Sequence, residues 1–354
     1  MKRFDMHIHC GDQPVDPEKL LAKMDACGIY GGVLFSQYPK ESKSDGYDAE
    51  TRMSQVLDIC RNYPDRLFPV LWIHPHEPNA LEVAEEAVRR GIVGFKMICD
   101  NYYVSDPDSM ALVRKIAELG KPIIFHSGIL WFGGDTSKYN RPLNWECLVN
   151  IKGLRFSLGH CSWPWIDECI ALYGKFLNAY TEGMGAEMFF DTTPGTPAIY
   201  RRELLTKLYT VGYDVEDNVF FGSDCSADNY NSDWVQKWLD TDSTILQKMG
   251  ADAPLFRKMY HDNLLRFLGF KQRDFVHTSP ASDDSHAWTI GTERTSAAPI
   301  RYAREHYEGN FEELLPVLDD AYALYQKDDT TLSGDEKTDL LASLLRAYRR
   351  EEQK

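Results

Sequence analysis

The sequence predicts an α/β chain folded as a (β/α)8 barrel of the TIM type, followed by a helical C-terminal extension. Three observations lead to this prediction. Strand-like and helix-like segments alternate, and the strands recur about every thirty residues. Ionisable side chains stand at the ends of at least five separate apolar strands. No glycine-rich nucleotide-binding turn follows the first strand, although an open doubly wound sheet usually carries one there.

The first elements show the alternation clearly. Residues 4–9 form an apolar run typical of a strand, and Asp16-Pro17 then begins a helix. Proline fits the first helical position because its missing N–H would have no partner there. Gly28 ends the helix, since glycine adopts the left-handed conformation common at helix C-termini. The next strand is predicted at residues 31–35.

The later elements follow the same order. A helix is predicted over residues 79–90, and a second helix runs from Asp106-Pro107 to Gly120. A last helix over residues 259–268 is expected to pack on the outside of the barrel. The remaining strands, each followed by a helical pattern, are expected at residues 67–73, 93–96, 122–126, 154–159, 187–191 and 218–223.

The domain organisation follows from a change in composition. Residues 1–271 form the predicted barrel, and residues 272–354 form a linker and a helical extension. The segment 271–297 is rich in Ser, Thr, Asp and Ala and lacks periodicity, whereas helical patterns return at 298–326 and 335–350. We expect the extension to pack on the barrel or on a second subunit, in which case the protein is a homodimer.

Composition excludes several classes of partner. The 354-residue chain has a formal net charge of −15 and no basic run, which argues against nucleic acid. It contains no apolar stretch near the roughly 20 residues that cross a bilayer, and its first three residues lead directly into a strand. The eight cysteines include no CxxC pair, so disulfides and a zinc-thiolate cluster are not expected. We predict a cytoplasmic protein that acts on a small molecule.

A metal centre is predicted from the side chains at the strand ends. His7 and His9 are two residues apart in a strand, so both imidazoles project to the same side. Asp224 ends the last strand, and with the two imidazoles it offers three ligands for a divalent ion. His126 and His160 follow the fifth and sixth strands. Because all strands of a barrel end at one face, the five groups are expected to converge.

This combination resembles the amidohydrolase superfamily, and in particular the amidohydrolase-related branch that includes aminocarboxymuconate-semialdehyde decarboxylase. The resemblance spans roughly residues 3–270 and is carried by Asp5-Met6-His7-Ile8-His9, Gly94-Phe95-Lys96, Phe125-His126-Ser127-Gly128, Gly159-His160-Cys161-Ser162-Trp163-Pro164 and Gly222-Ser223-Asp224. It implies four ligands for one Zn²⁺ ion, with Mn²⁺ as another candidate: His7, His9, His126 and Asp224. It also implies that His160 either helps to bind a second ion or polarises the substrate.

Lys96, at the end of the fourth strand, bears on the number of metals. By the same resemblance, a lysine at this place is carbamylated in binuclear members and bridges two ions. A desolvated lysine has the lowered pKa that this modification requires. In the other interpretation the site holds one metal, and Lys96 pairs with a carboxylate of the protein or the substrate. The sequence leaves both open.

Four residues in the predicted loops are candidates for substrate binding. Arg141 follows the fifth strand and can grip a carboxylate through two hydrogen bonds, although a surface salt bridge is an equal alternative. Trp131, Trp163 and Tyr102 can line an aromatic pocket or simply pack the loops. Asp191 ends the seventh strand and is expected to orient a metal-ligand imidazole or to cap a helix.

These residues lead to a hypothesis of function: metal-dependent hydrolysis of an amide, ester or lactone in a small, carboxylate-bearing substrate. Asp224 would take a proton from metal-activated water and return it to the leaving group, while His160 or the metal holds the carbonyl oxygen. The alternative is non-oxidative decarboxylation of a small unsaturated or aromatic acid, because the resembled branch includes decarboxylases. A catalytically silent barrel is disfavoured, since no expected ligand is missing.

Overall fold

The computed structural model describes residues 1–181 and 185–270, and it confirms the predicted barrel. All strands belong to one parallel sheet in the order β8-β7-β6-β5-β4-β3-β2-β1-β9. The strands are β1 (Phe4–His9), β2 (Gly31–Phe35), β3 (Leu67–Trp72), β4 (Gly94–Met97), β5 (Ile123–Phe125), β6 (Arg155–Leu158), β7 (Glu187–Asp191), β8 (Val219–Phe220) and β9 (Cys225–Ser226). The predicted linker and extension, residues 272–354, lie outside the described residues.

The eighth strand of the barrel is split into β8 and β9. β8 pairs with β7, and β9 pairs with β1, so the two segments together join the last strand to the first. Between them, Met6 N donates to Phe221 O at 2.9 Å and Asp224 N donates to His7 O at 2.9 Å. These bonds continue the ladder across the interruption. The sheet therefore closes, and Asp224 lies at the seam.

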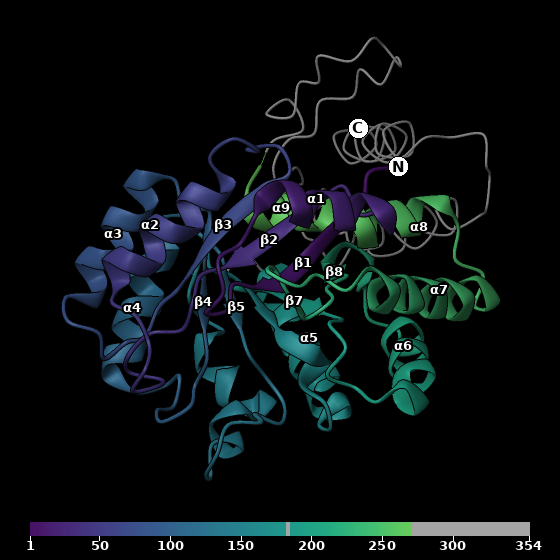
Figure 1. Cartoon of the computed structure of the whole chain (residues 1–354). Helices are drawn as coiled ribbons and strands as arrows, with labels where there is room; N and C mark the ends of the chain where they lie inside the picture. The colour runs from purple at the N-terminus through teal and green to yellow at the C-terminus, as the bar shows by residue number, and fades with distance from the viewer. Residues whose placement is uncertain (182–184, 271–354) are drawn as a thin grey trace, which may run out of the picture. The chain divides into compact units, whose positions relative to one another are not determined.

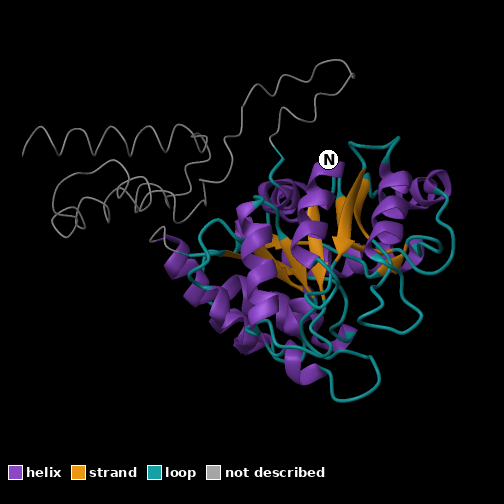
Figure 2. Cartoon of the chain, turned by 90° about the vertical axis from the view of Figure 1, so that its left-hand side faces the viewer, coloured by secondary structure: helices purple, strands orange, loops and turns teal. Residues whose placement is uncertain are grey.

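Helices surround the strands, as Figures 1 and 2 show. None of the helices in the described ranges is long and apolar enough to cross a membrane. The α-helices are α1 (Pro17–Ala26), α2 (Ala49–Cys60), α3 (Ala80–Arg90), α4 (Pro107–Glu118), α5 (Ile166–Thr181), α6 (Arg201–Thr210), α7 (Ser232–Lys248), α8 (Ala253–Arg257) and α9 (Asn263–Leu268), with a π-helix at Lys258–Asp262 between the last two.

The connection from β5 to β6 departs from the prediction that a helix follows each strand. It contains the short 3-10 helices Ser137–Asn140 and Pro142–Leu148 in place of an α-helix. The segment carries Gly128, Gly133 and Gly134 as well as a proline, and these residues interrupt helical hydrogen bonding. The longer, irregular connection leaves room for a loop at the mouth of the barrel.

The predicted helix starts are found where expected. Asp16 caps α1, and its carboxylate accepts hydrogen bonds from the backbone N–H groups of Glu18 and Lys19. Asp106 precedes α4, but its carboxylate accepts from the N–H of Tyr103 at 2.9 Å instead of from the helix. Asp16 therefore caps its helix, whereas Asp106 fixes the loop that enters α4.

Helix α9 corrects the expectation that the last helix covers the outside of the barrel. Its apolar side chains share one buried cluster with Phe4 and Met6 of the barrel interior. The Phe267 ring lies 4.9 Å from Phe189 and 5.2 Å from Phe220, measured between ring centroids. Because Phe4 is the first residue of β1, this helix closes the end of the barrel where the strands begin.

A bulge in β1 redirects its side chains. Between Asp5 and Ile8 the strand contains one residue more than its partner β2. Met6 therefore packs in the barrel interior, whereas Ile8 packs in the cluster between sheet and helices. His7 and His9 consequently both face inward at the carboxyl end of the barrel, on the side where the site lies.

Candidate metal centre

One pocket of about 400 Å³ opens at the carboxyl ends of the strands, and most of the predicted site residues line it. His9 ends β1, Lys96 belongs to β4, and Asp224 lies between β8 and β9. His7 lies beneath the pocket with 1% of its surface exposed. The lining residues of functional interest are His9, Tyr38, Lys43, Trp72, Lys96, His126, Trp131, Phe132, His160, Trp163 and Asp224.

Three ligand atoms form a triangle at the floor of this pocket. His7 Nε2 lies 3.1 Å from His9 Nε2 and 3.6 Å from Asp224 Oδ1, and the His9–Asp224 distance is 3.3 Å. Ligands about 2.1 Å from a tetrahedral zinc ion are separated by about 3.4 Å. The three distances match this spacing, so the triangle fits a single divalent ion.

The second nitrogen of His7 is held by Asp191. His7 Nδ1 donates to Asp191 Oδ2 at 2.6 Å, which leaves the lone pair of Nε2 directed at the triangle. Burial and the nearby Lys96 lower the pKa of His7 to about 3, so its imidazole is neutral and able to ligate. Burial alone would raise the pKa of Asp191, but His7 outweighs this effect and keeps it below its ordinary value. Asp191 therefore orients the imidazole of His7, whereas the other role considered for it was to cap a helix.

Asp224 adopts an unusual backbone conformation to reach the site. Its φ of 62° is in the left-handed region, which costs a non-glycine residue on the order of 1 kcal/mol or more. Its side chain is 39% exposed, toward the pocket. Partial burial would raise the pKa of Asp224, but the hydrogen bond from His9 and the nearby His160 hold it well below its ordinary value. The carboxylate is therefore ionised.

His160 lies on a strained turn after β6. It begins three consecutive residues with positive φ, His160, Cys161 and Ser162, at 59°, 44° and 58°. Its Nδ1 is buried and has no hydrogen-bond partner in the described residues, and burial lowers its pKa. A Cβ on Gly195 would lie 2.7 Å from His160, so only glycine fits against this ring. With His7 and Asp224, His160 offers ligand atoms that all lie within 4.8 Å of one another.

His126 stands next to His160, with 5.0 Å between the ring centroids. Its Nε2 donates to the carbonyl of Ile129 at 3.2 Å, which leaves Nδ1 without a proton in the neutral ring. Burial, together with His160 and Lys96, lowers the pKa of His126 well below its ordinary value. His126 is thus a neutral imidazole in the pocket, beside the triangle of His7, His9 and Asp224.

Lys96 is fully buried beside this triangle. Its Nζ lies 3.4 Å from His7 Nε2 and 4.8 Å from the centre of the Phe35 ring. Burial lowers the pKa of Lys96 to about 8, although Asp191 and Asp224 act in the opposite direction. The amine is therefore close enough to the site to serve either of its two predicted roles.

Two predicted substrate-binding residues lie elsewhere, whereas Trp131 and Trp163 line the pocket. Arg141 pairs with Glu168 at 2.9 Å, which corresponds to the salt-bridge alternative. Tyr102 is 1% exposed, and its ring packs on His74 at 4.8 Å between centroids. Neither side chain lines the pocket, because the loops that carry them turn toward neighbouring helices and loops.

Several residues of the site were missed by sequence reasoning. Asp5 is fully buried, and its carboxylate accepts from the N–H groups of His7 and Ser223 and from the hydroxyl of Tyr230. It thereby ties β1 to the segment that carries Asp224. Only its place two residues before His7 could have drawn attention to it. The pocket residues Tyr38, Lys43, Trp72 and Phe132 had no distinguishing pattern at all.

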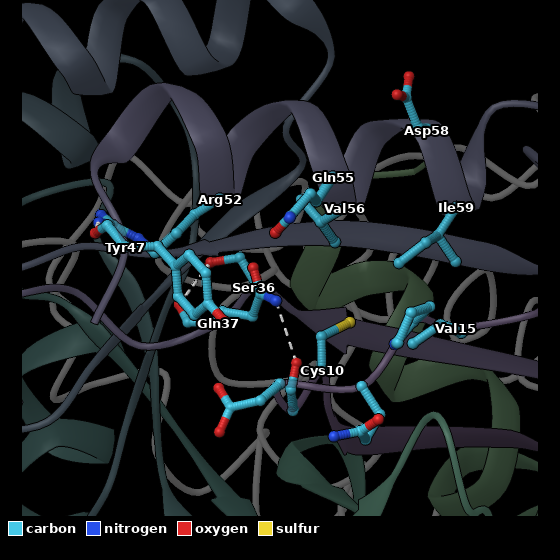
Figure 3. Close-up of a pocket in the computed structure, with 14 residues that line it drawn as sticks. Cys10, Val15, Ser36, Gln37, Tyr47, Arg52, Gln55, Val56, Asp58 and Ile59 are labelled. Carbon is cyan, nitrogen blue, oxygen red and sulfur yellow. Dashed lines mark hydrogen bonds between the residues drawn. The ribbon is translucent and has the colours of Figure 1, made fainter. Parts of the chain in front are cut away.

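A second cavity of about 300 Å³ lies beside the loop after β1 (Figure 3). Cys10 and Gly11 line both cavities, and Gln37 Nε2 donates to Gly11 O at 3.1 Å. Arg52 also lines the second cavity, with its guanidinium held by both carboxylate oxygens of Glu77. The group with metal-ligand spacing in the described residues includes His160 and Asp224, which line the larger pocket and not this cavity, so the functional site is assigned to the larger pocket. All eight cysteines, including Cys10, are free thiols.

The fold and this centre define a (β/α)8 barrel with a potential metal site at the carboxyl ends of its strands. The chain belongs to the amidohydrolase family: the sequence model described as Amidohydrolase (Amidohydro_2) matches residues 4–270. A comparison with curated proteins finds no match. The family assignment confirms the resemblance stated above and coincides with the barrel.

Solved structures with similar folds have low sequence identity. A probable 2-pyrone-4,6-dicarboxylic acid hydrolase from Acinetobacter baumannii is 15% identical with a TM-score of 0.55, covering 76% of this chain and 100% of that one. An uncharacterized TIM-barrel protein from Bordetella bronchiseptica is 17% identical with a TM-score of 0.56, covering 76% and 99%. The 2,6-dihydroxybenzoate decarboxylase from Rhizobium is 14% identical with a TM-score of 0.53, covering 76% and 99%. These likenesses establish the fold alone.

Proposed function

We propose that this protein is a metal-dependent hydrolase that cleaves an amide, ester or lactone bond in a small, carboxylate-bearing substrate. The observation that carries the proposal is the triangle of His7, His9 and Asp224 at the floor of an accessible pocket. Membership of the amidohydrolase family supports it. The similar barrel described as a probable 2-pyrone-4,6-dicarboxylic acid hydrolase is named for a lactone with two carboxyl groups, which fits the same class of substrate.

The donor set suits one divalent ion, with Zn²⁺ as the first candidate and Mn²⁺ as the second. His7, His9 and Asp224 would hold the ion, and either His160 or His126 would complete the set. The buried and unpartnered Nδ1 of His160 and the neutral imidazoles support this fit. When bound, such an ion would polarise a carbonyl and lower the pKa of a water molecule.

The protein's own groups would position the substrate and move the protons. The ionised Asp224 has its carboxylate partly exposed in the pocket, where it can accept a proton from water and deliver it to the leaving group. His160 lines the pocket beside it and can hold the carbonyl oxygen. Lys96 can pair with a substrate carboxylate or, once carbamylated, bridge a second ion. The aromatic side chains that line the pocket would confine the substrate.

Decarboxylation of a small unsaturated or aromatic acid remains the second candidate function. The observation that favours it is the largely apolar wall of the pocket, where Trp72, Leu130 and Phe132 present surfaces suited to a planar ring. The similar barrel named 2,6-dihydroxybenzoate decarboxylase is consistent with this candidate. Because a carboxylate loses solvation against such a wall, its release as carbon dioxide becomes easier.

Metal analysis and a substrate panel test the proposal. We would measure zinc and manganese per chain on protein purified without chelator, then assay 2-pyrone-4,6-dicarboxylate and simple aryl esters for hydrolysis, and 2,6-dihydroxybenzoate for release of carbon dioxide. One metal with ester or lactone cleavage would support hydrolysis. Two metals would also assign the bridging role to carbamylated Lys96.

The opposite outcomes are equally informative. Carbon dioxide release without hydrolysis would replace the first candidate by the second. Protein that binds no metal, even after incubation with Zn²⁺ or Mn²⁺, would refute the metal-dependent mechanism in both forms. Cytoplasmic location and a homodimeric state remain predictions, and the eight free thiols are consistent with the first.

A further inference from the structure

We propose that Lys43 binds a carboxylate of the substrate at the mouth of the pocket, and that the substrate is a planar unsaturated acid lying along the wall of Trp72, Leu130 and Phe132. This carboxylate does not take part in the reaction, which occurs at another part of the substrate, near Asp224. The inference deepens the proposed function and rests on it for the identity of the reacting site. Lys43 takes the role that the sequence suggested for Arg141, which is paired with Glu168 instead.

The loop that carries Lys43 has a defined conformation. Lys43 N donates to Pro39 O at 3.2 Å, Gly46 N donates to Lys43 O at 2.9 Å, and Tyr47 N donates to Tyr38 O at 3.1 Å. A Cβ on Gly46 would lie 2.5 Å from Pro39 O, so this close approach requires glycine. These bonds hold the loop closed at its base and direct Lys43 toward the pocket.

Two further contacts anchor the base and the tip of the loop to the barrel. Arg52 on α2 donates from its guanidinium to the carbonyl of Tyr47, and its other bonds go to Glu77 and to the carbonyl of Trp72. Asn101 Nδ2 donates to the carbonyl of Glu41 at 3.4 Å. The loop that carries Lys43 is therefore held by hydrogen bonds to the barrel at both Glu41 and Tyr47.

The ammonium group of Lys43 lies over aromatic rings rather than beside an acid. Its Nζ is 4.0 Å from the centre of the Tyr38 ring and 5.4 Å from that of Phe132. Lys43 forms no ion pair with any residue in the described part of the chain, whereas Lys40 in the same loop pairs with Asp48 at 3.9 Å. The rings orient the cation through their negative faces and leave its N–H groups free for an anion.

The charge balance of the pocket also suits an acid. Although the chain carries a net charge of −15, the described residues that line the pocket include two lysines and a single carboxylate, Asp224. The wall between Lys43 and the floor of the pocket is apolar, with Trp72, Ile98 and Leu130 in one buried cluster. A cation at the mouth, an apolar wall and a polar floor complement a planar molecule with a carboxylate at one end.

A matched pair of probes tests this assignment on the protein as purified. Isophthalate has two carboxylates, whereas 3-carbamoylbenzoate has the same shape with one carboxylate replaced by a neutral amide. We expect isophthalate to bind about tenfold more tightly in isothermal titration calorimetry, since a charge-assisted bond contributes that much. Lys43→Met should abolish this difference in affinity between the two probes, and Lys43→Arg should retain most of it. The difference should also shrink at high salt.

Lys40→Met is the control, because it removes the same charge from the same loop and should preserve the difference. Circular dichroism and metal content should match the wild type in all three variants. A full difference in Lys43→Met, equal affinities in the wild type, or no binding of either probe would overturn the assignment. The wild type could lack metal and hydrolytic activity and still bind isophthalate more tightly than 3-carbamoylbenzoate in a way that depends on Lys43. That result would refute the proposed function but support the carboxylate site at Lys43.

Discussion

At the scale of single residues, His7 uses both of its nitrogens. One donates to Asp191 and the other faces His9 and Asp224, so the ring is fixed in a single orientation and tautomer. Its burial keeps it neutral at physiological pH. The ring therefore has the orientation needed for ligation before an ion binds, because its conformational entropy is lost during folding and not during binding.

Replacing His9 tests the ligand set with little risk to the fold. His9 has 30% of its side chain exposed, so we expect His9→Ala to lose most of the bound metal while its circular dichroism spectrum remains native. His76→Ala is the matched control, because His76 is exposed and lies outside the pocket. Elemental analysis of both variants gives the result. Full metal content in His9→Ala would remove His9 from the site.

Changing Asp224 to Asn tests its role in proton transfer. The amide keeps the shape of the side chain but cannot accept a proton, so turnover per bound metal ion should fall by about 10²–10⁴-fold with a much smaller change in KM. The hydrolytic substrate found in the panel would be used for this assay. Asp228→Asn, an exposed change in the same loop, should retain activity. Unchanged turnover in Asp224→Asn would leave that residue only a structural role.

At the scale of elements, the split eighth strand determines how tightly the site is built. A Cβ on Gly222 would lie 2.1 Å from Thr193 Oγ1 and 2.7 Å from His7 Cβ. The backbone of this segment must therefore approach both β1 and the loop after β7 closely. Only glycine permits that approach, and Asp224 reaches the pocket two residues later.

Gly222→Ala should consequently destabilise the protein and disturb the site. Overpacking of this kind costs about 1–3 kcal/mol, which lowers Tm by several degrees in a chain of this size. Displacement of His7 should also weaken metal binding. Gly133→Ala provides the control, since its Cβ would meet no atom within 4 Å. Equal Tm values for the two variants, from thermal denaturation followed by circular dichroism, would contradict the close packing described for Gly222.

The sequence predicted most elements but not their local irregularities. Periodicity located the strands and the helix starts at Asp16 and Asp106, because those signals are local. The bulge between Asp5 and Ile8 depends on pairing with β2, which no local pattern encodes. The interior position of α9 was missed for a similar reason. Helix α9 has apolar residues on several faces, and this pattern does not show whether the helix will pack on the outside of the barrel or at its end.

At the scale of the whole barrel, closure brings together groups that are distant in the sequence. The parallel order of the strands places the ends of β1, β3 and β4 around one pocket. For this reason the convergence of His7, His9 and Asp224 could be predicted from their places at strand ends. The positions of Arg141, Tyr102 and the Lys43 loop could not, since loop paths depend on contacts that sequence spacing does not fix.

Removal of the metal should therefore affect the stability of the entire barrel. An ion that binds only the folded chain stabilises it by about 2.7 kcal/mol when present at a hundred times its dissociation constant. We expect EDTA treatment to lower Tm measurably and Zn²⁺ to restore it. His9→Ala should show no response to either reagent. An identical Tm with and without bound zinc in the wild type would argue against the ligand triangle.

The seam of the barrel has a consequence for how the protein matures. The donor atoms on β1 and at Asp224 come from the first and last strands, which meet through the pairing of β1 with β9 and through the bonds of Met6 with Phe221 and of His7 with Asp224. A chain that has not completed its final strand has no triangle to offer. Binding of the ion would thus require a closed barrel, and a chain whose last strand has not paired with β1 should bind neither metal nor substrate at this site.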